Sequence, residues 1–531
     1  MTFLAPRPGG GPRGCCRIYM SAVLLAALNP IAFSQETTPP PSQETAPPPA
    51  QEATPPPPPP PKPPAAPALV IQGGTIHLGN GQTLEGGVVI IENGKISAVG
   101  ADVAVPEGAT IIDAATRHVF PGLIDCGARL CVDPSTLTEG SALIQANVVD
   151  ALEFFDVEQE QEALSQGITS IYVGGLGRGN LNGFGAFLKL RPGATAAEKV
   201  IHKDSMVHVL LGRPDATAHE KLRAQAAFSG QLQAARKYIE SFDDYNEKLE
   251  EYKKALQKLL EEIEKDPSKA KVPKTEGGKP EPEAKPAETP APPAEGEGEG
   301  RRRRPRRPPG NVWEEILGVE ARVLALEEPA KPAAEGEKKE EKKEEAPKKP
   351  QPPQRTPAME AWRQVLEGKV TLCVTANTAA DVQNLLDLRS EYRFRLVLFG
   401  GTQGEALATE LKEAGIPLIF TVQPGTKEVG NAVRLHNEGV STVLATAGQS
   451  PLESRTLPLC VASVIAEGMD ASAALSAVTS RAAKVLGVDA RVGSLSVGKD
   501  ADVVIADAPP FATSTRVLQV LIEGRTVYQR Q

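Results

Sequence analysis

The residues that could carry chemistry stand at the ends of a few strand-like stretches. The first is HVFPGLIDCGARL, residues 118–130, where apolar residues broken by Pro and Gly lead into polar ones, a pattern typical of a strand and turn. Because side chains alternate along a strand, positions 127 and 129 would share one face. Gly127 offers no ligand atom, and the guanidinium of Arg129 carries a fixed positive charge. The pattern disfavours a metal cation and indicates either an anionic ligand or a structural salt bridge.

Three other candidates lie on later strands. The run SMVHVLLG places His208 inside a strand, where a lone histidine is more commonly a hydrogen-bonded core residue than a ligand. The run VTLCVTAN carries Thr375 and Asn377. We predict that Arg129 and these three residues bind a ligand. We assign no catalytic residue, because no spacing pairs a nucleophile with a base.

Composition narrows the classes of function. The chain has 531 residues, enough for two or three domains, and its net charge of -9 does not favour nucleic acid as a partner. It contains only six histidines, which is few for a metal-dependent hydrolase. The cysteines that follow the N-terminal segment have no CxxC spacing, so neither a disulfide scaffold nor a zinc site is predicted.

The N-terminus has the pattern of a secretory signal peptide, residues 1–34. A region with several arginines precedes an apolar run at 18–33, and small residues suit cleavage near Ser34–Gln35. The run is short for a membrane span, which needs about 20 apolar residues. We therefore predict export to the periplasm or the extracellular space, with an uncleaved membrane anchor as the alternative.

Two segments have compositions that cannot bury a core. Residues 35–67 are proline-rich and favour an extended spacer or a ligand for a proline-binding partner. Residues 216–356 begin with a charged helix at 224–260 and continue as Lys-, Glu-, Pro- and Ala-rich tracts typical of disorder. Within them, a basic cluster at 301–307 could bind an anionic polymer, and an amphipathic helix is predicted at 311–326.

Two remote runs carry a family resemblance. PGLID, at residues 121–125, resembles the first barrel strand of the amidohydrolase superfamily, the imidazolonepropionase-like and dihydroorotase-like metal-dependent hydrolases. GSLSVGKDADVV, at 493–504, resembles the C-terminal signature of that family. Short strands with an Asn93–Gly94 hairpin turn lie before the first run. The resemblance implies an α/β fold with a TIM-like (β/α)8 barrel and a small β-domain built from both chain ends.

The domain boundaries follow from this resemblance together with composition. We expect a signal peptide (1–34), a proline-rich linker (35–67), a composite β-domain (68–120 and 488–531), and a barrel (121–487) that the charged helical and low-complexity insertion (216–356) interrupts.

The resemblance also implies which positions would hold the family's zinc or other divalent metal. The first strand of the family continues with two histidines, at positions that are Gly127 and Arg129 here. The fifth-strand histidine matches Thr375, the sixth-strand histidine matches Gly400, and residues 444–451 contain no aspartate for the eighth strand. We therefore predict no metal and no other cofactor.

The leading hypothesis is an exported, amidohydrolase-like protein without catalysis, which binds a small anionic ligand or serves as a scaffold. Envelope or protein partners would contact the proline-rich and Lys/Glu-rich segments, and the protein could form a homo-oligomer. The alternative is a divergent hydrolase acting on non-peptide carbon–nitrogen bonds or cyclic amide or ester bonds. In that case Asp125, Cys131, His208 and Cys373 would converge inside the barrel.

Overall fold

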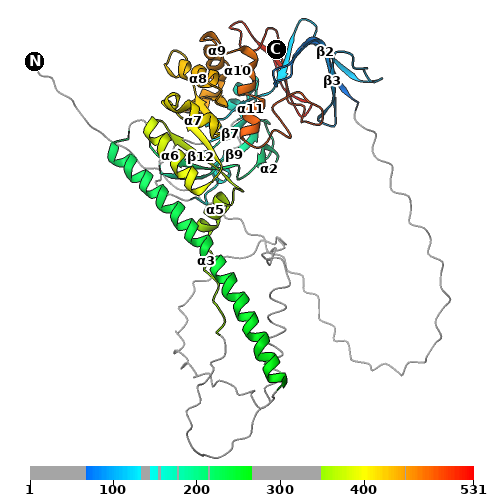
Figure 1. The fold of residues 1–531 in the computed structure, drawn as a ribbon. Coiled ribbons are helices and arrows are strands. Elements are labelled where there is room, and N and C mark those ends of the chain that lie inside the picture. The colour runs from blue at the N-terminus through cyan, green and yellow to red at the C-terminus, as the bar shows by residue number, and fades with distance from the viewer. Residues whose placement is uncertain are drawn as a thin grey trace, which may run out of the picture. The chain divides into compact units, whose positions relative to one another are not determined.

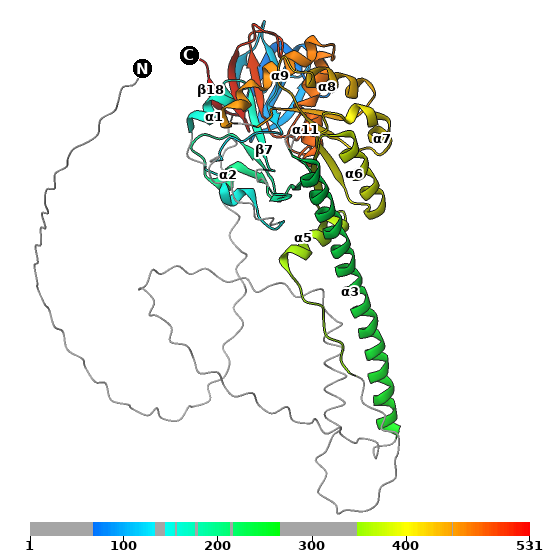
Figure 2. The same ribbon diagram turned by 90° about the vertical axis from the view of Figure 1, so that its left-hand side faces the viewer.

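The structure, a computed structural model, describes residues 67–132, 144–153, 157–175, 179–212, 216–265, 348–448 and 450–531 (Figures 1 and 2). The predicted signal peptide, nearly all of the proline-rich linker, the basic cluster and the predicted helix at 311–326 lie outside these residues. Among the described helices, none combines the length and the apolar composition that a membrane crossing requires.

The first sheet joins strands from both ends of the chain. Its order is β18-β17-β16-β5-β1-β2-β3, and β4 also pairs with β1. The N-terminal strands are β1 (Leu69–His77), β2 (Thr83–Glu92), β3 (Lys95–Gly100), β4 (Thr110–Asp113) and β5 (His118–Pro121). The C-terminal strands are β16 (Val503–Ala506), β17 (Val517–Ile522) and β18 (Arg525–Gln529). The two groups meet where β5 pairs antiparallel with β16.

The turn between β2 and β3 forms as the sequence predicts. Asn93 and Gly94 both have positive φ, 52° and 78°, and the flanking Glu92 and Lys95 are paired across the hairpin. Two consecutive left-handed residues match the right-handed twist of the strands, which is why Asn-Gly is favoured here.

Two further sheets hold the parallel strands other than β1, β4 and β5, which pair in parallel within the first sheet. One has the order β10-β9-β7-β6, and the other has the order β15-β14-β13-β12-β11-β8. In the first of these, β6 (Leu123–Asp125) pairs in parallel with β7 (Ile168–Val173). In the second, each strand from β11 to β15 pairs in parallel with the next. These strands are β11 (Met206–Leu210), β12 (Thr371–Ala376), β13 (Leu396–Gly400), β14 (Leu418–Thr421) and β15 (Thr442–Ala445). By contrast, β8 (Leu181–Phe184), β9 (Ala186–Lys189) and β10 (Val200–His202) pair antiparallel. The described pairings thus form an α/β fold, and the closed (β/α)8 barrel that the family resemblance implies stays a prediction.

Side chains of both parallel sheets meet in one interior cluster. Eight strands contribute buried residues to it: Ile124, Tyr172, Phe187, Met206, Cys373, Val397, Ile419, Val443 and Ala445. Neighbouring residues along the same strands belong to a second cluster, which packs against the helices: Leu123, Ile171, Val207, Leu372, Leu398, Leu418 and Leu444. This division follows from the alternation of side chains along buried strands.

Helices follow most of these strands (Figure 1). They are α1 (Val157–Leu164), α2 (Ala196–Lys199), α3 (Ala218–Lys265), α5 (Pro357–Leu366), α6 (Ala379–Tyr392), α7 (Ala408–Glu413), α8 (Glu428–Asn437), α9 (Leu457–Ala466), α10 (Ala471–Ala477) and α11 (Ser480–Val485), with short 3-10 helices η2 (Val148–Ala151), η4 (Gly404–Leu407) and η5 (Pro451–Thr456). Asp470 caps α10, accepting from the Ala473 N–H at 2.9 Å. Between α10 and α11, the carbonyl of Val478 accepts from the Ile124 N–H of β6 at 2.8 Å.

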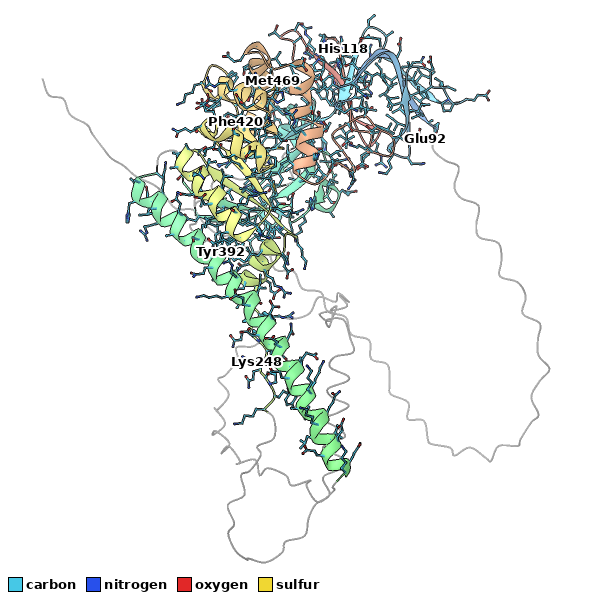
Figure 3. All side chains as sticks on the ribbon, in the orientation of Figure 1. Glu92, His118, Lys248, Tyr392, Phe420 and Met469 are labelled. Atoms are coloured by element: carbon cyan, nitrogen blue, oxygen red, sulfur yellow. The ribbon has the colours of Figure 1, made fainter. Side chains whose placement is uncertain are left out.

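The charged helix of the insertion is longer than the predicted 224–260. It spans 48 residues as α3 and begins after Thr217, whose N–H and hydroxyl both donate to Glu220. Its first half enters the core, where Phe228 packs near Trp362 of α5. Its second half, labelled at Lys248 in Figure 3, carries a separate small apolar cluster around Tyr245.

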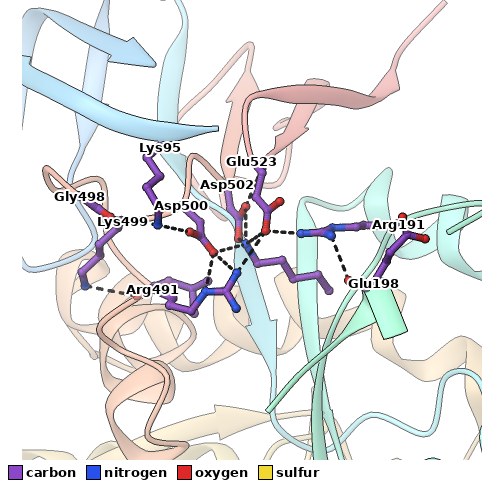
Figure 4. Close-up of polar contacts among 11 residues, drawn as sticks. Lys95, Arg191, Glu198, Arg491, Gly498, Lys499, Asp500, Asp502 and Glu523 are labelled. Carbon is purple, nitrogen blue, oxygen red and sulfur yellow. Dashed lines mark hydrogen bonds and ion pairs between the residues drawn. The ribbon is translucent and has the colours of Figure 1, made fainter. Parts of the chain in front are cut away.

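A buried ionic cluster ties β9 to the C-terminal signature run (Figure 4). The side chain of Lys189 is fully buried, and its ammonium lies 2.8 Å from Asp500, 2.9 Å from Asp502 and 3.2 Å from Glu523. The guanidinium of Arg491 lies 2.8 Å from Asp500 and 3.3 Å from Glu523. Each acidic group therefore has a cationic partner, which is the condition for keeping charges out of water.

Candidate functional site at the strand ends

The first parallel strand ends earlier than predicted, at Asp125. The sequence suggested that the strand continues through Arg129, but residues 126 and 127 form a turn. The turn is held by the buried carboxylate of Asp125, which accepts from the Gly127 N–H at 3.0 Å and the Thr446 N–H at 3.1 Å. Its other oxygen accepts from the hydroxyls of Thr446 at 2.7 Å and Ser454 at 2.8 Å. The carboxylate therefore joins the ends of β6 and β15.

The two strand ends are in backbone contact beside this carboxylate. A side-chain carbon built at Gly127 would lie 2.1 Å from the carbonyl oxygen of Thr446, and one built at Gly448 would lie 2.2 Å from the carbonyl oxygen of Gly127. Any side chain at position 127 would require the backbone of the neighbouring strand end to move. Glycine is needed there for close approach.

Arg129 follows directly and is half-buried. Burial lowers the pKa of its guanidinium, while the nearby Glu453 carboxylate raises it. None of the hydrogen bonds or ion pairs among the described residues involves Arg129. Glu453 also accepts from the Gln423 amide at 3.4 Å. This end of the site therefore carries a cation whose charge is only partly balanced.

Thr375 and Asn377 lie at the end of β12, as expected. Thr375 is partly buried, and its carbonyl accepts from the Leu211 N–H at 3.1 Å. The amide oxygen of Asn377 lies 2.4 Å from where a side-chain carbon at Gly400 would stand, and Gly400 has a φ of 87°. The Asn377 side chain thus occupies the space that a residue at position 400 would need.

His208 faces the interior and does not reach an open surface. Its side chain is buried, and its Nε2 lies 2.7 Å from the hydroxyl of Tyr172. Gly174 and Gly175 cover the ring, since a side-chain carbon at either would lie within 2.7 Å of an imidazole nitrogen. Burial lowers the pKa of His208 to about 4, so the imidazole is neutral at physiological pH.

Cys373 is the register partner of His208 on the adjacent strand. It is fully buried, and burial raises the pKa of its thiol. A neutral thiol is a weak nucleophile, and no hydrogen bond joins these two described side chains. The pair therefore lacks the contact that nucleophilic catalysis requires.

The structure separates the four predicted residues into three environments. Arg129 lies beside Glu453, Thr375 and Asn377 lie at the end of β12, and His208 is paired with Tyr172 in the interior. Sequence reasoning missed the hydroxyl partners of Asp125 and the tyrosine partner of His208. Their contacts span 321, 329 and 36 residues, and the sequence carries no local signal for them.

Comparisons with known proteins place this arrangement in a family. A model described as the amidohydrolase family matches residues 390–527. Imidazolonepropionase of Brevibacillus brevis is 36% identical over 113 residues, which cover 20% of this chain and 26% of that protein. The crystal structure of an amidohydrolase from Thermotoga maritima MSB8 has a TM-score of 0.58 at 17% identity, covering 87% of this chain and 100% of that chain. These similarities support membership of this chain in the amidohydrolase superfamily.

The sequence relatives are matched over short parts of their length. Amidohydrolase tasK of Hapsidospora irregularis is 26% identical over 179 residues, 31% of this chain and 18% of that protein. The chain therefore spans about a quarter or less of these two relatives. The likeness to the Thermotoga amidohydrolase shows the shared α/β fold.

The divalent metal that the superfamily resemblance implies does not fit the residues present at the strand ends. The implied ligand positions hold Gly127, Arg129, Thr375 and Gly400, which provide neither an imidazole nor a carboxylate. The backbone of Thr446 also occupies the space that a side chain at position 127 would need. Across the described ranges, no three His, Cys, Asp or Glu side chains are close enough together to hold a metal ion.

Proposed function

We propose that this amidohydrolase-superfamily protein binds a small anionic ligand at its strand ends and does not carry out metal-assisted hydrolysis. The observation that carries the proposal is the backbone contact between Gly127 and Thr446, which leaves no room for a ligand side chain at the first metal position. Hydrolysis by the family's chemistry needs a metal to lower the pKa of water and a carboxylate to move a proton. The carboxylate of Asp125, which lies beside this contact, already accepts four hydrogen bonds.

The charge at the strand ends supports an anionic ligand. Arg129 is half-buried, always protonated near neutral pH, and has no hydrogen-bond partner among the described residues. A planar guanidinium presents a fork of donors that suits carboxylate or phosphate groups. Thr375 and Asn377 would add neutral polar contacts.

Binding of simple anions to the full-length protein tests the proposal. We expect succinate or inorganic phosphate to bind in isothermal titration calorimetry, and Arg129→Gln to weaken binding roughly 10- to 100-fold, because a hydrogen bond to a charged group contributes about 1.5–3 kcal/mol. The matched control is Arg455→Gln, which removes an arginine that is 53% exposed and paired with Glu162. Equal affinity in wild type and Arg129→Gln would contradict the proposal, as would the absence of binding by both anions.

The alternative function is a divergent hydrolase acting on carbon–nitrogen or cyclic amide or ester bonds. The 2.7 Å contact between His208 and Tyr172 favours it, since a neutral imidazole beside a hydroxyl can act as a general base. The relatives named amidohydrolase and imidazolonepropionase suggest which bonds to test. We expect no turnover of a cyclic amide and lactone panel, with or without added zinc. Turnover that His208→Gln abolishes and His436→Gln preserves would overturn our proposal.

We further propose that the parallel strands form a TIM-like barrel carrying a composite β-domain, and that the protein is exported. The interior cluster drawn from eight strands supports the barrel. The basic and apolar pattern of residues 1–34 supports export. Cell fractionation with N-terminal sequencing should find a mature chain that begins near Gln35. A full-length cytoplasmic pool would count against export.

A further inference from the structure

The second half of α3 carries a continuous apolar stripe, which we call the distal stripe. Its members recur every three or four residues and therefore lie on one face of the helix: Tyr245, Leu249, Tyr252, Leu256 and Leu260. The residues between them are mostly charged and exposed, as around Lys248, which Figure 3 labels. A stripe of this kind is typical of a helix that packs against a second helix.

The described residues do not account for the burial of this stripe. Leu256 and Leu260 are only 6% and 8% exposed, but neither belongs to any apolar cluster among the residues that the structure describes. Tyr245 and Leu249 form a small cluster with Tyr252. The hydroxyl of Tyr245 is also buried, and it has no hydrogen-bond partner within the described ranges. Because buried groups of both kinds need contacts, the stripe requires a packing partner beyond the described residues.

The path of the chain returns to this same helix. Between Lys265, where α3 ends, and Lys348, residues 266–347 lie outside the described ranges, and they number 82. Residues 348–350 then line an open cavity together with Tyr252 and Ala255 of α3. The chain therefore leaves at one end of the distal stripe and returns beside its middle. Any segment between these two points is held near the stripe at a high effective concentration.

One segment of this stretch has a matching pattern. In residues 311–326, where the sequence predicts an amphipathic helix, apolar side chains recur at separations of four, three, four and three residues: Val312, Ile316, Val319, Val323 and Leu326. The distal stripe spans residues 245–260, so both runs are 16 residues long, about 24 Å as helices. The rest of the stretch is rich in Pro, Lys, Glu and Gly, and its sequence contains no other apolar run of this length.

We propose that residues 311–326 form a helix that packs antiparallel on the distal stripe, which makes the insertion a two-helix arm. The antiparallel direction puts residue 311 beside the end of α3 and residue 326 toward the return of the chain at Lys348. Linkers of 45 and 21 residues join the segment to these two points, which is ample for this direction. The stripe is buried within a single chain, which favours this segment over a second copy of the protein.

Hydrogen exchange followed by mass spectrometry on the full-length protein tests this packing. We expect the amides of residues 311–326 to exchange slowly in the wild type. In the double variant Leu249→Asp/Leu256→Asp they should exchange at least about 10-fold faster, because an aspartate cannot replace a buried leucine in an apolar contact. The matched control is Leu222→Asp, at a leucine of α3 that is 64% exposed, and it should leave the exchange of 311–326 as in the wild type.

The reciprocal double variant, Ile316→Asp/Val323→Asp, leaves the sequence of α3 unchanged. It should speed exchange at residues 245–260 by a similar factor, which a loss of helix stability within α3 alone could not explain. Rapid exchange of 311–326 in the wild type would overturn the inference, and so would slow exchange there that neither double variant changes. Protection that rises with protein concentration, together with dimers in sedimentation, would make a second copy the partner and would overturn it as well.

The arm is separate from the strand ends, so this inference and the proposed function fail separately. None of the residues substituted here is assigned to anion binding, and both double variants should bind succinate or phosphate as the wild type does. An absence of anion binding would contradict the proposed function and leave the expected exchange pattern of the arm unchanged.

Discussion

Replacing Lys189 with methionine is expected to lower the free energy of unfolding by about 3–5 kcal/mol. The substitution keeps the volume of the side chain but removes the cation that lies within 3.2 Å of three carboxylates. Asp500 and Asp502 are nearly inaccessible to water and would be left with excess negative charge. Urea denaturation near neutral pH, followed by circular dichroism, measures the loss.

Lys95→Met is the matched control for this prediction. Lys95 lies 2.9 Å from the same Asp500 carboxylate, but its side chain is 55% exposed. Exposed ion pairs contribute about 0–1 kcal/mol, so we expect a loss below about 1 kcal/mol. If the two variants were equally stable, burial of the Lys189 ammonium would have no energetic consequence, and the cluster could not be a link between β9 and the C-terminal run.

The difference in the free energy of unfolding between the wild type and the Lys189→Met variant should shrink as the pH falls. Burial opposes ionisation of Asp500, but the hydrogen bonds from Lys189 and Lys95 outweigh it and hold the pKa of Asp500 at about 2. Because this pKa is depressed, ionised Asp500 adds to the stability of the fold when the pH is above the unfolded value of 3.8. That contribution is lost as the pH falls through about 2. Burial raises the pKa of Asp502, so ionisation of Asp502 lowers the stability of the fold instead of adding to it. In acid the wild type loses the stability that ionised Asp500 contributes. The variant is relieved of its unpaired negative charges when the carboxylates become protonated. The two urea unfolding curves should therefore converge.

Local patterns predicted the elements of this fold well. The Asn93–Gly94 turn, the Asp470 cap and the strands around His208 and Thr375 all lie where the sequence indicates them. In each case the signal is a turn residue, a capping residue or a β-rich run, which acts within a few residues of its own position.

Features set by distant contacts were not predictable. β6 ends at Asp125 because β15, more than 300 residues later, supplies a hydrogen-bonded turn partner. Lys189 is a charged residue in a strand, and only the tertiary fold reveals the carboxylates that permit its burial. The contact between His77 and His118 likewise depends on the register of β1 with β5. The sequence could show that the family's ligands are missing, but not that a neighbouring backbone occupies the space at Gly127.

The second large effect is expected at the strand ends themselves. Asp125→Ala should lower the free energy of unfolding by about 3 kcal/mol or more, because hydrogen bonds to a charged group contribute about 1.5–3 kcal/mol each. The change leaves the part-buried N–H group of Gly127 and the buried N–H group of Thr446 without an acceptor, and it frees the hydroxyl of Ser454. Urea denaturation, followed by the fluorescence of the buried Trp362, measures the loss.

Asp125→Asn separates the shape of this group from its charge. The asparagine oxygen can still accept from the two N–H groups, and its amide can donate to the hydroxyls of Thr446 and Ser454, which accept as well as donate. We therefore expect a loss of only about 1 kcal/mol, together with anion binding like that of the wild type. Equal losses in the two variants would mean that the charge of Asp125 matters more than its hydrogen-bond geometry. Loss of anion binding in Asp125→Asn with little change in stability would instead place Asp125 among the groups that act on the ligand, and the strand-end junction would then be part of the binding machinery.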